Sequence, residues 1–404
     1  MSREAEWIVQ AIEAVGKTAE KDGEYWRASY TEQDRKATAL LRQYMEEAGM
    51  ETYVDAVGNL FGRIGGKDSR VLLTGSHRDT VRNGGKYDGM LGVLTALKAA
   101  GDLKAEWGVP EKTVEIVAFC EEESSRFPTS YLGSRNVTGS LTPEELEDLD
   151  ENGISLREAM KKSGYLKGEI GVPRTDLERF TELHIEQGGV LEKEGIQIGI
   201  VTSIVGLFTG EVYVRGQQNH AGTTPMYMRR DPVPVAAEFI CLLNRWAMDH
   251  QQDLVCTVGR IDVEPGNANV IPEQVMFTFD IRSSSEELLA ESREKIARLK
   301  EQLNGEQEIT VKITCDEPPV HLDPEGRERL KEAAEEEKLT YKEMVSGAGH
   351  DSQAIGQKYK TNMIFVPSKD GVSHSPREYT FPEDIGAGYA VLKNYLKKTA
   401  WQKD

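Results

Sequence analysis

The sequence predicts an α/β protein whose doubly wound, mainly parallel sheet is interrupted by a smaller α+β domain. Three observations predict it. Short apolar runs alternate with helical patterns over the first half of the chain, alternating strands with two long helices follow Gly206, and the first pattern returns from about Pro318. Such alternation is typical of parallel sheets covered on both faces. We therefore expect one domain from residues 1–208 and 319–404, with residues 209–318 inserted into it.

The elements of the first domain follow from hydrophobic periodicity. Apolar residues at helical spacing predict helices over residues 2–16, 31–48, 90–104 and 383–399. Short apolar runs predict strands over residues 60–64, 70–76, 113–119 and 361–366. Because the carboxyl ends of parallel strands share one sheet edge, polar residues that follow these strands are expected to meet there.

The inserted segment has a different pattern. Alternating polar and apolar residues predict strands within residues 209–215, 254–263 and 274–282. Helical spacing predicts helices over residues 231–248 and 286–303. Two helices on one face of an antiparallel sheet make a small α+β domain.

Composition excludes several classes of partner. The chain has 49 basic and 68 acidic residues and a net charge of -19, which repels nucleic acid. It has no apolar stretch of 18 residues that would predict a membrane span, since the best candidate, residues 198–208, is short and interrupted. Its four cysteines form no C-x-x-C pair, which predicts reduced thiols and a cytoplasmic location.

Five side chains lie in short, glycine-punctuated stretches beside apolar runs: His77, Asp88, Glu123, His184 and His374. Imidazole and carboxylate are the ligands that divalent transition metals prefer. A lone histidine is more often a core or surface residue, and a run of glutamates is more often a solvated face. Five such residues together favour a site for two metals, which lie about 3.5–4 Å apart in hydrolases of this kind.

Two further residues stand beside these candidates. Glu122 precedes Glu123 and is free to act as a base. Asp79 follows His77 by two residues, so its carboxylate can accept the second ring N–H and fix the tautomer. Cys120 is an alternative nucleophile, but three adjacent glutamates oppose thiolate formation. The sequence contains no G-x-S-x-G, H-E-x-x-H or phosphate-binding glycine motif.

Eight stretches carry a resemblance to a known family, in order from about residue 30 to the end. They are Gly75-Ser-His77-Arg-Asp79-Thr with Lys86-Tyr-Asp88-Gly, Glu122-Glu123-Ser-Ser-Arg-Phe-Pro, His184-Ile-Glu-Gln187-Gly, His220-Ala-Gly-Thr-Thr-Pro, Asn269-Val-Ile-Pro, Asp280-Ile-Arg282, Ser346-Gly-Ala-Gly-His350-Asp and Gly371-Val-Ser-His374-Ser-Pro. The chain resembles the allantoate amidohydrolase and N-carbamoyl-L-amino-acid hydrolase family, within the zinc-aminopeptidase-like metallopeptidase clan. The stretches around Phe119, Ile200 and Val345 look nearer the bacterial allantoate enzymes.

The resemblance implies a role for each candidate. His77, Asp88 and His184 would serve one divalent metal ion, and Asp88, Glu123 and His374 the other, with Asp88 bridging. The ions would be Mn or Zn, with Co and Ni as further options, because nitrogen and oxygen ligands discriminate poorly. Glu122 would be the general base, taking a proton from the attacking water and delivering it to the leaving nitrogen.

The resemblance also implies how substrate is held. His220 would come from a homodimer partner and bind the reacting carbonyl oxygen, although a loop histidine capped by Thr223 is the plainer alternative. The clamp for a small ureido acid would comprise Gln187, Asn269, Arg282 and the backbone of Gly347 and Gly349. His350 and Asp351 would order their loop. The inserted domain would be a ferredoxin-like lid and dimerisation domain that closes over substrate.

The expected reaction is hydrolysis of the carbamoyl C–N bond of allantoate to ureidoglycine, ammonia and CO2. Alternatives are an N-carbamoyl-L-amino-acid hydrolase, a dipeptidase or aminoacylase, and a catalytically silent metal-binding scaffold. Two residues depart from the family pattern: Ser124 stands at a usual glycine and Arg78 at a usual aliphatic residue. Ser124 would stiffen the turn, and Arg78 would add a cation near the site or point to solvent.

Overall fold

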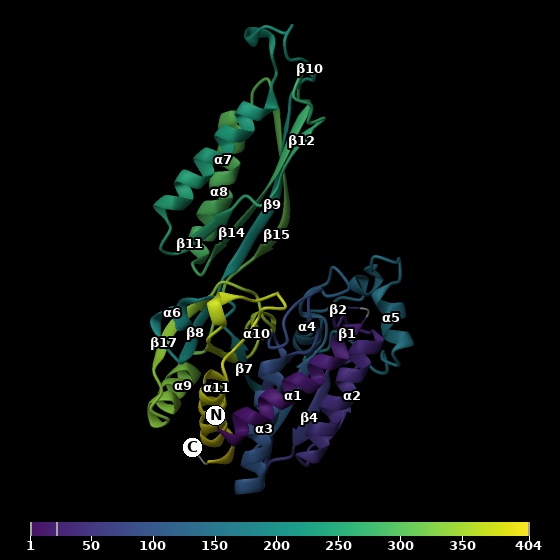
Figure 1. Ribbon diagram of the computed structural model, residues 1–404, viewed down its shortest axis with the longest axis vertical. Coiled ribbons are helices and arrows are strands. Elements are labelled where there is room, and N and C mark those ends of the chain that lie inside the picture. Colours follow the sequence, from purple (N-terminus) through teal and green to yellow (C-terminus); the bar gives the residue numbers. More distant parts are fainter. Residues whose placement is uncertain (1, 22, 403–404) are drawn as a thin grey trace. The chain divides into compact units, whose positions relative to one another are not determined.

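The computed structural model describes residues 2–21 and 23–402, which fold into two compact units. Unit 1 comprises Met1–Thr202 and Leu322–Asp404, and unit 2 comprises Ser203–His321. Unit 1 is therefore built from both ends of the chain, as the colours in Figure 1 show.

Unit 1 contains most of the helices. They are α1 (Arg3–Ala19), α2 (Glu32–Glu47), α3 (Met90–Trp107), α4 (Leu132–Thr138), α5 (Leu156–Lys162), α6 (Val190–Glu194), α9 (Pro324–Glu336), α10 (Asp351–Gly356) and α11 (Pro382–Leu396), with the short turns η1 (Glu144–Glu147), η3 (Lys369–Gly371) and η4 (Lys397–Trp401). The four helices that the sequence predicts correspond to α1, α2, α3 and α11, and are confirmed. Ser2 and Thr31 cap α1 and α2 by accepting from backbone N–H groups, which explains where these helices begin.

The strands outside the inserted sheet are β1 (Glu20–Lys21), β2 (Glu24–Tyr25), β3 (Glu51–Val54), β4 (Leu60–Ile64), β5 (Asp68–His77), β6 (Lys112–Phe119), β7 (Leu177–Ile185), β8 (Ile198–Ile204), β16 (Val320–His321), β17 (Tyr341–Ser346) and β18 (Lys360–Val366). The large sheet has the order β16-β8-β18-β7-β5-β6-β4-β3, and β17 also pairs with β8. Its four central strands, β18, β7, β5 and β6, run parallel. The flanking pairs β3–β4, β4–β6, β18–β8 and β16–β8 are antiparallel. The predicted mixed α/β fold with a mainly parallel centre is confirmed, while its antiparallel flanks were not predicted.

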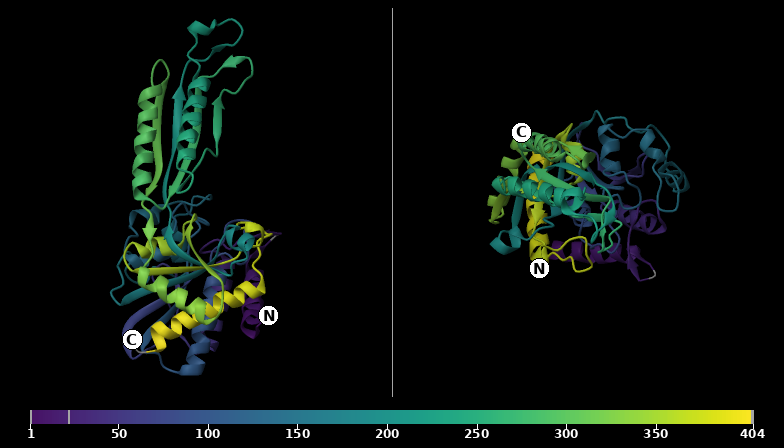
Figure 2. Two further views of the ribbon diagram at one scale, coloured as in Figure 1. Left: turned by 90° about the vertical axis from the view of Figure 1, so that its left-hand side faces the viewer. Right: turned by 90° about the horizontal axis from the view of Figure 1, so that it is seen from above.

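Both faces of the large sheet are buried. Leu72 and Ile116 face a core that also contains residues of α1, α3 and α11. Their strand neighbours Leu73 and Val117 face a second core that includes residues of α4 and α10. This alternation explains why the central strands are apolar on both sides. Helices α1 and α11 contact each other, so the two ends of the chain cover the same face (Figure 2).

Unit 2 is an antiparallel sheet with two long helices. Its strands are β9 (Gly206–Arg215), β10 (Asn219–His220), β11 (Leu254–Thr257), β12 (Ile261–Glu264), β13 (Val270–Ile271), β14 (Gln274–Ser283) and β15 (Glu308–Glu317), and its helices are η2 (Met226–Met228), α7 (Pro232–Asp249) and α8 (Glu286–Leu303). The main sheet has the order β11-β14-β9-β15, with β12 also on β14, and α7 and α8 share its core.

Two features of unit 2 differ from the prediction. The strand predicted within residues 254–263 is divided into β11 and β12. Strand β15 was not predicted, because most of its side chains are exposed or half-buried and its apolar alternation is weak. Within the described part of the chain, no helix is both long and apolar enough to cross a bilayer.

Candidate active site

The candidate residues of unit 1 lie at the carboxyl edge of the parallel strands. His77 is the last residue of β5, His184 lies one residue before the end of β7, and Glu122 follows β6 closely. Asp88 precedes helix α3, which returns from the same edge. Ligand sites of open α/β sheets form at this edge, because the loops that follow parallel strands converge there.

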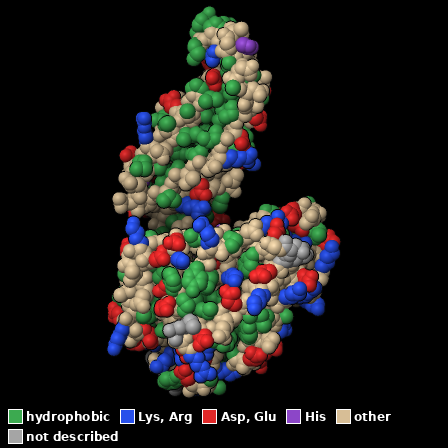
Figure 3. Space-filling model, viewed as in Figure 1, with side chains coloured by type: hydrophobic (Ala, Val, Ile, Leu, Met, Phe, Trp, Pro, Cys, Tyr) green, Lys and Arg blue, Asp and Glu red, His purple; other side chains and the backbone are tan. Residues whose placement is uncertain are grey.

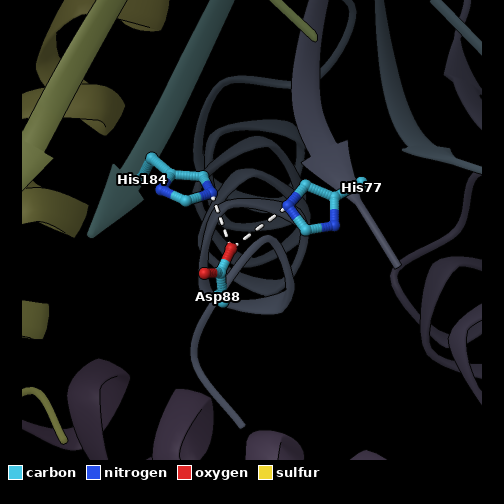
Figure 4. A group of neighbouring side chains, drawn as sticks. All are labelled: His77, Asp88 and His184. Atoms are coloured by element: carbon cyan, nitrogen blue, oxygen red, sulfur yellow. Dashed lines mark ion pairs between the residues drawn. The ribbon is translucent and has the colours of Figure 1, made fainter. Parts of the chain in front are cut away.

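Two imidazoles face one carboxylate oxygen. The Nε2 atoms of His77 and His184 both lie 3.2 Å from Oδ1 of Asp88, and all three side chains are buried (Figure 4). This oxygen has no hydrogen-bond partner within the described residues. Four ligands placed about 2.0–2.1 Å from a tetrahedral ion are about 3.3–3.4 Å from one another. The three side chains therefore have a spacing that fits a divalent cation.

The other ring nitrogens determine which tautomer is present. Nδ1 of His77 lies 3.1 Å from the carbonyl oxygen of Asp79, and Nδ1 of His184 lies 3.0 Å from that of Ile185. A carbonyl oxygen only accepts, so Nδ1 carries the proton in both rings. In the neutral form of this tautomer each Nε2 has a lone pair available for a cation, as a metal ligand requires. The backbone N–H of Gly89 also lies 3.2 Å from Nε2 of His184.

A second group of ligands shares Asp88. Nε2 of His374 lies 3.3 Å from Oδ2 of Asp88 and 3.1 Å from Oε1 of Glu123. The two oxygens of Asp88 therefore face different groups, as a bridging carboxylate requires. The ligand atoms within each group lie within 4.8 Å of one another. All five predicted ligands are brought together, and their donor set fits two divalent ions.

The Glu122 carboxylate lies beside the first group. Its Oε2 atom is 4.0 Å from Nε2 of His77, and the residue is 7% exposed. Its backbone N–H and that of Glu123 donate to the two carboxylate oxygens of Asp79, both at 3.1 Å. Asp79 thus orients the candidate base and a candidate ligand together.

This arrangement corrects one expectation. The sequence predicts that the Asp79 carboxylate accepts the ring N–H of His77, but that oxygen is 3.8 Å away. The backbone carbonyl of Asp79 lies closer, at 3.1 Å, and accepts the proton instead. The carboxylate is used by the loop after β6, since two buried N–H groups there need acceptors.

The charges of the site are unbalanced without cations. Burial raises the pKa of the Glu122 carboxyl, the positive charge of His77 opposes this, and the carboxylates of Glu123, Asp351 and Asp79 reinforce it, so the pKa lies well above its ordinary value. Burial would lower the pKa of His77, but the surrounding carboxylates outweigh it and raise the pKa well above 6.5. Crowded carboxylates of this kind are stabilised by bound cations.

The structure shows the surroundings of the two residues that depart from the family pattern. Arg78 is fully buried, and its Nε donates to Oδ1 of Asp34 at 2.6 Å, so it neither faces solvent nor joins the ligand groups. Ser124 has a backbone φ of 47°, in the left-handed region that glycine favours. Its hydroxyl lies 2.9 Å from that of Ser130, which ties the strained turn to the loop.

The alternative nucleophile Cys120 lacks the necessary environment. Its thiol is buried, and burial raises the pKa well above the ordinary value, with the nearby Arg78 only partly opposing it. Reactive cysteines need a lowered pKa and access to solvent. Cys120 is therefore a core residue.

The predicted substrate clamp is divided between the two units. In unit 1, Nε2 of Gln187 donates to Oδ2 of Asp88 at 2.9 Å, so this residue lies at the ligand groups. Gly349 lies beside Tyr131, because a Cβ atom placed there would be 1.8 Å from the tyrosine hydroxyl. In unit 2, His220 and Asn269 are neighbours, since the N–H of Ala221 donates to the carbonyl of Asn269.

Sequence reasoning missed some residues near the ligands. His350 is buried with its ring centroid 4.6 Å from that of His184, although it was expected only to order its loop. Glu378 is buried and accepts from the backbone of Tyr87 and Asp88. Its position four residues after His374 is the sequence signal that could have identified it.

Comparison with known proteins agrees with this geometry. Residues 73–398 match the model of peptidase family M20/M25/M40. The allantoate amidohydrolase of Bacillus subtilis (strain 168) is 44% identical over 409 residues, covering 98% of this chain and 96% of the relative. The N-carbamoyl-L-amino acid amidohydrolase of Geobacillus stearothermophilus is 39% identical over 410 residues, covering 99% of this chain and 98% of the relative. A crystal structure of an amidase of the hydantoinase/carbamoylase family from Burkholderia multivorans has a TM-score of 0.89 and 34% identity, covering 97% of both chains.

The family match and the named relatives identify a hydrolase of C–N bonds, and the imidazole and carboxylate groups at the sheet edge are able to hold divalent metal ions. The chain belongs to peptidase family M20/M25/M40, with amidohydrolases among its relatives. The predicted resemblance is thereby confirmed.

Proposed function

We propose that the protein hydrolyses the carbamoyl C–N bond of allantoate, giving ureidoglycine, ammonia and CO2. The observation that carries this proposal is the Asp88 carboxylate placed between two ligand groups, with Glu122 buried beside them. The choice of allantoate is supported by the higher identity to an allantoate amidohydrolase, 44% against 39% for an N-carbamoyl-L-amino acid amidohydrolase. Hydrolysis of N-carbamoyl-L-amino acids is the second candidate, because it needs the same chemistry.

The proposed ligand roles follow the geometry. His77, Asp88 and His184 would hold one divalent ion, and Asp88, Glu123 and His374 the other. When bound, such ions would polarise the reacting carbonyl and lower the pKa of the attacking water. Nitrogen and oxygen ligands suit Mn or Zn, and also Co or Ni.

Glu122 would move the proton. Its carboxylate is oriented through the backbone by Asp79, and burial, reinforced by nearby carboxylates, raises its pKa. It would accept a proton from the attacking water as the new C–O bond forms, and donate it to the leaving nitrogen as the C–N bond breaks. The released carbamate then yields ammonia and CO2.

A test is the Glu122→Gln variant, which keeps the shape of the side chain and removes the base. We expect turnover to fall by about 10²–10⁴-fold with two ions still bound. The exposed Glu144→Gln variant, with the same charge change, is the control and should match the wild type. Wild-type turnover by Glu122→Gln with full metal content would refute the mechanism. A panel of allantoate and carbamoylated amino acids, each with Mn, Zn, Co and Ni, separates the two substrates.

Unit 2 would serve as a ferredoxin-like lid and dimerisation domain. Its β9-α7-β11-β14-α8-β15 connectivity and antiparallel order support this assignment. At one end of the unit, Met226, Tyr227 and Met228 are exposed, and Figure 3 shows hydrophobic side chains gathered there. Exposed apolar groups of this kind mark protein–protein contacts.

The predicted clamp residues within unit 2 support a homodimer. His220 lies in β10 and Asn269 directly precedes β13, its partner strand, whereas Arg282 lies near the end of β14 and pairs with Val255 of β11. Figure 1 shows β10 and β11 at opposite ends of unit 2. The eight residue-to-residue steps from Gln274 to Arg282 span about 26 Å of strand, which is much longer than a small ureido acid. The three side chains of one chain therefore cannot hold one substrate. We assign His220 and Asn269 to the substrate of a partner subunit.

Mixing two inactive variants tests this assignment. Glu122→Gln and His220→Ala are each expected to be inactive as homodimers. Random exchange makes half of the dimers mixed, and each mixed dimer would have one intact site, so about a quarter of wild-type activity should return. No recovery after verified exchange would refute action between subunits.

All four cysteines are free, which is consistent with the proposed cytoplasmic location.

A further inference from the structure

Glu378 is a buried carboxylate that connects two of the candidate ligand loops. One oxygen, Oε1, accepts from the backbone N–H groups of Tyr87 and Asp88, at 2.9 and 3.0 Å. The other, Oε2, lies 3.0 Å from the hydroxyl of Ser373, the residue before His374. A single side chain therefore contacts both the loop that carries Asp88 and the loop that carries His374.

The Ser373 hydroxyl extends this connection to a ligand atom. It lies 2.9 Å from Oδ2 of Asp88, the oxygen that faces His374. Since one hydroxyl has one proton, it can donate to only one of the two carboxylates at a time. When Asp88 engages a cation, Glu378 is left as the acceptor that keeps Ser373 in place.

The chain around Glu378 is shaped to admit it. A Cβ atom on Gly85 would lie 2.0 Å from the Glu378 carboxylate, so any larger residue there would displace it. On the other side, His374 has a φ of 52°, a left-handed conformation that is strained for a residue with a Cβ atom. Contacts must hold such a backbone, and the Glu378 side chain supplies one through the neighbouring Ser373.

We propose that Glu378 is a positioning residue that assembles the second ion site, formed by Asp88, Glu123 and His374. This inference rests on the proposed function, in which these residues hold one of two divalent ions. The first site gets His77 and His184 directly from β5 and β7, which the sheet fixes without Glu378. The second site depends on a loop from the C-terminal part of the chain, which Glu378 joins to the Asp88 loop.

The decisive variant is Glu378→Gln, which keeps the size of the side chain. The amide oxygen still accepts from Tyr87 and Asp88, but the amide nitrogen can only donate to the Ser373 hydroxyl. The hydroxyl proton is then directed at Oδ2 of Asp88, where it competes with a cation for that oxygen. Ser373→Ala removes the same link from the other side and leaves the backbone contacts intact. Loss of a group that orients ligands typically lowers metal affinity by about 10–100-fold.

Asp150→Asn is the matched control. Asp150 is also a buried carboxylate, with Oδ1 accepting from the backbone of Asn152 and Ile154 and Oδ2 accepting from Nε of Arg126, all at 2.9 Å. None of these described hydrogen-bond partners is a candidate ligand. Both variants lose a buried carboxylate that holds a loop. Only Glu378→Gln should change metal binding if the inference is correct.

The test is a titration of metal-free full-length protein with Mn²⁺, in which calorimetry and chelator competition measure the affinity for each ion. Electron paramagnetic resonance reports the spin-coupled ion pair. We expect the wild type and Asp150→Asn to bind two ions alike. In Glu378→Gln and Ser373→Ala, the second ion should bind about 10–100-fold more weakly, the coupled signal should weaken, and the first ion should bind as in the wild type.

Two results would overturn the inference. Wild-type affinity for both ions in Glu378→Gln shows that the residue does not assemble the site, and equal loss at both sites shows a general structural role. A wild type that binds only one ion would contradict the proposed two-ion function itself, so the two failures are distinguishable.

Discussion

Asp79→Asn is the perturbation that the geometry makes most specific. The Asp79 carboxylate is fully buried and accepts one N–H from Glu122 and one from Glu123, each at 3.1 Å. Asparagine keeps one acceptor oxygen but presents an N–H donor to the other backbone N–H. One buried donor is then left unpaired, which costs about 1–3 kcal/mol. For a protein of this size that corresponds to a fall in melting temperature of about 1–4 °C.

The same change should reduce catalysis. The turn that carries the candidate base and a candidate ligand would shift, and small misplacements of catalytic groups cost up to about 10²-fold in rate. Urea unfolding and steady-state turnover measure the two effects. Asp150→Asn is the control, since it should lose comparable stability and keep wild-type turnover. If Asp79→Asn retains the stability and turnover of the wild type, the assigned role of Asp79 is wrong.

Three further predictions concern stability. Ser124→Gly should raise the free energy of unfolding by up to about 1 kcal/mol, because φ is 47° there, and an unchanged or lower value in urea would contradict the strain. Asp34→Ala should cost about 3–5 kcal/mol by leaving the buried Arg78 unpaired, whereas the Asp34→Leu/Arg78→Met double variant should recover much of it in the same assay. Hydrogen bonds to Asp88 and Glu123 raise the pKa of His374 from 6.5 to about 10. Protonated His374 should therefore stabilise the folded, metal-free protein in full below pH 6.5, and this contribution to the free energy of unfolding should be lost as the pH rises towards 10. Urea unfolding across this range, with His374→Ala losing the dependence, checks it.

The sequence was sufficient for the parts of the site that lie close to secondary structure. Glu122 and Glu123 follow an apolar strand, and His77 ends another, so the rule for parallel sheets places them at one edge. The prediction for Asp79 failed because spacing of two residues cannot tell a backbone carbonyl from a carboxylate as the partner of His77. Strand β15 escaped prediction for a related reason, since an edge strand with few buried side chains leaves little periodicity.

Taken alone, the order of residues determined the alternating strands and helices, the five candidate ligands and the class of chemistry. Those features depend on burial patterns and residue types that are readable over short stretches. Tertiary structure alone decided that Arg78 pairs with Asp34 and that Glu378 joins the loops of Asp88 and His374. Arg78 and Asp34 lie 44 residues apart along the chain, and Glu378 and Asp88 lie 290 residues apart. Which buried polar groups meet across such separations depends on how the layers pack, and no local pattern records it.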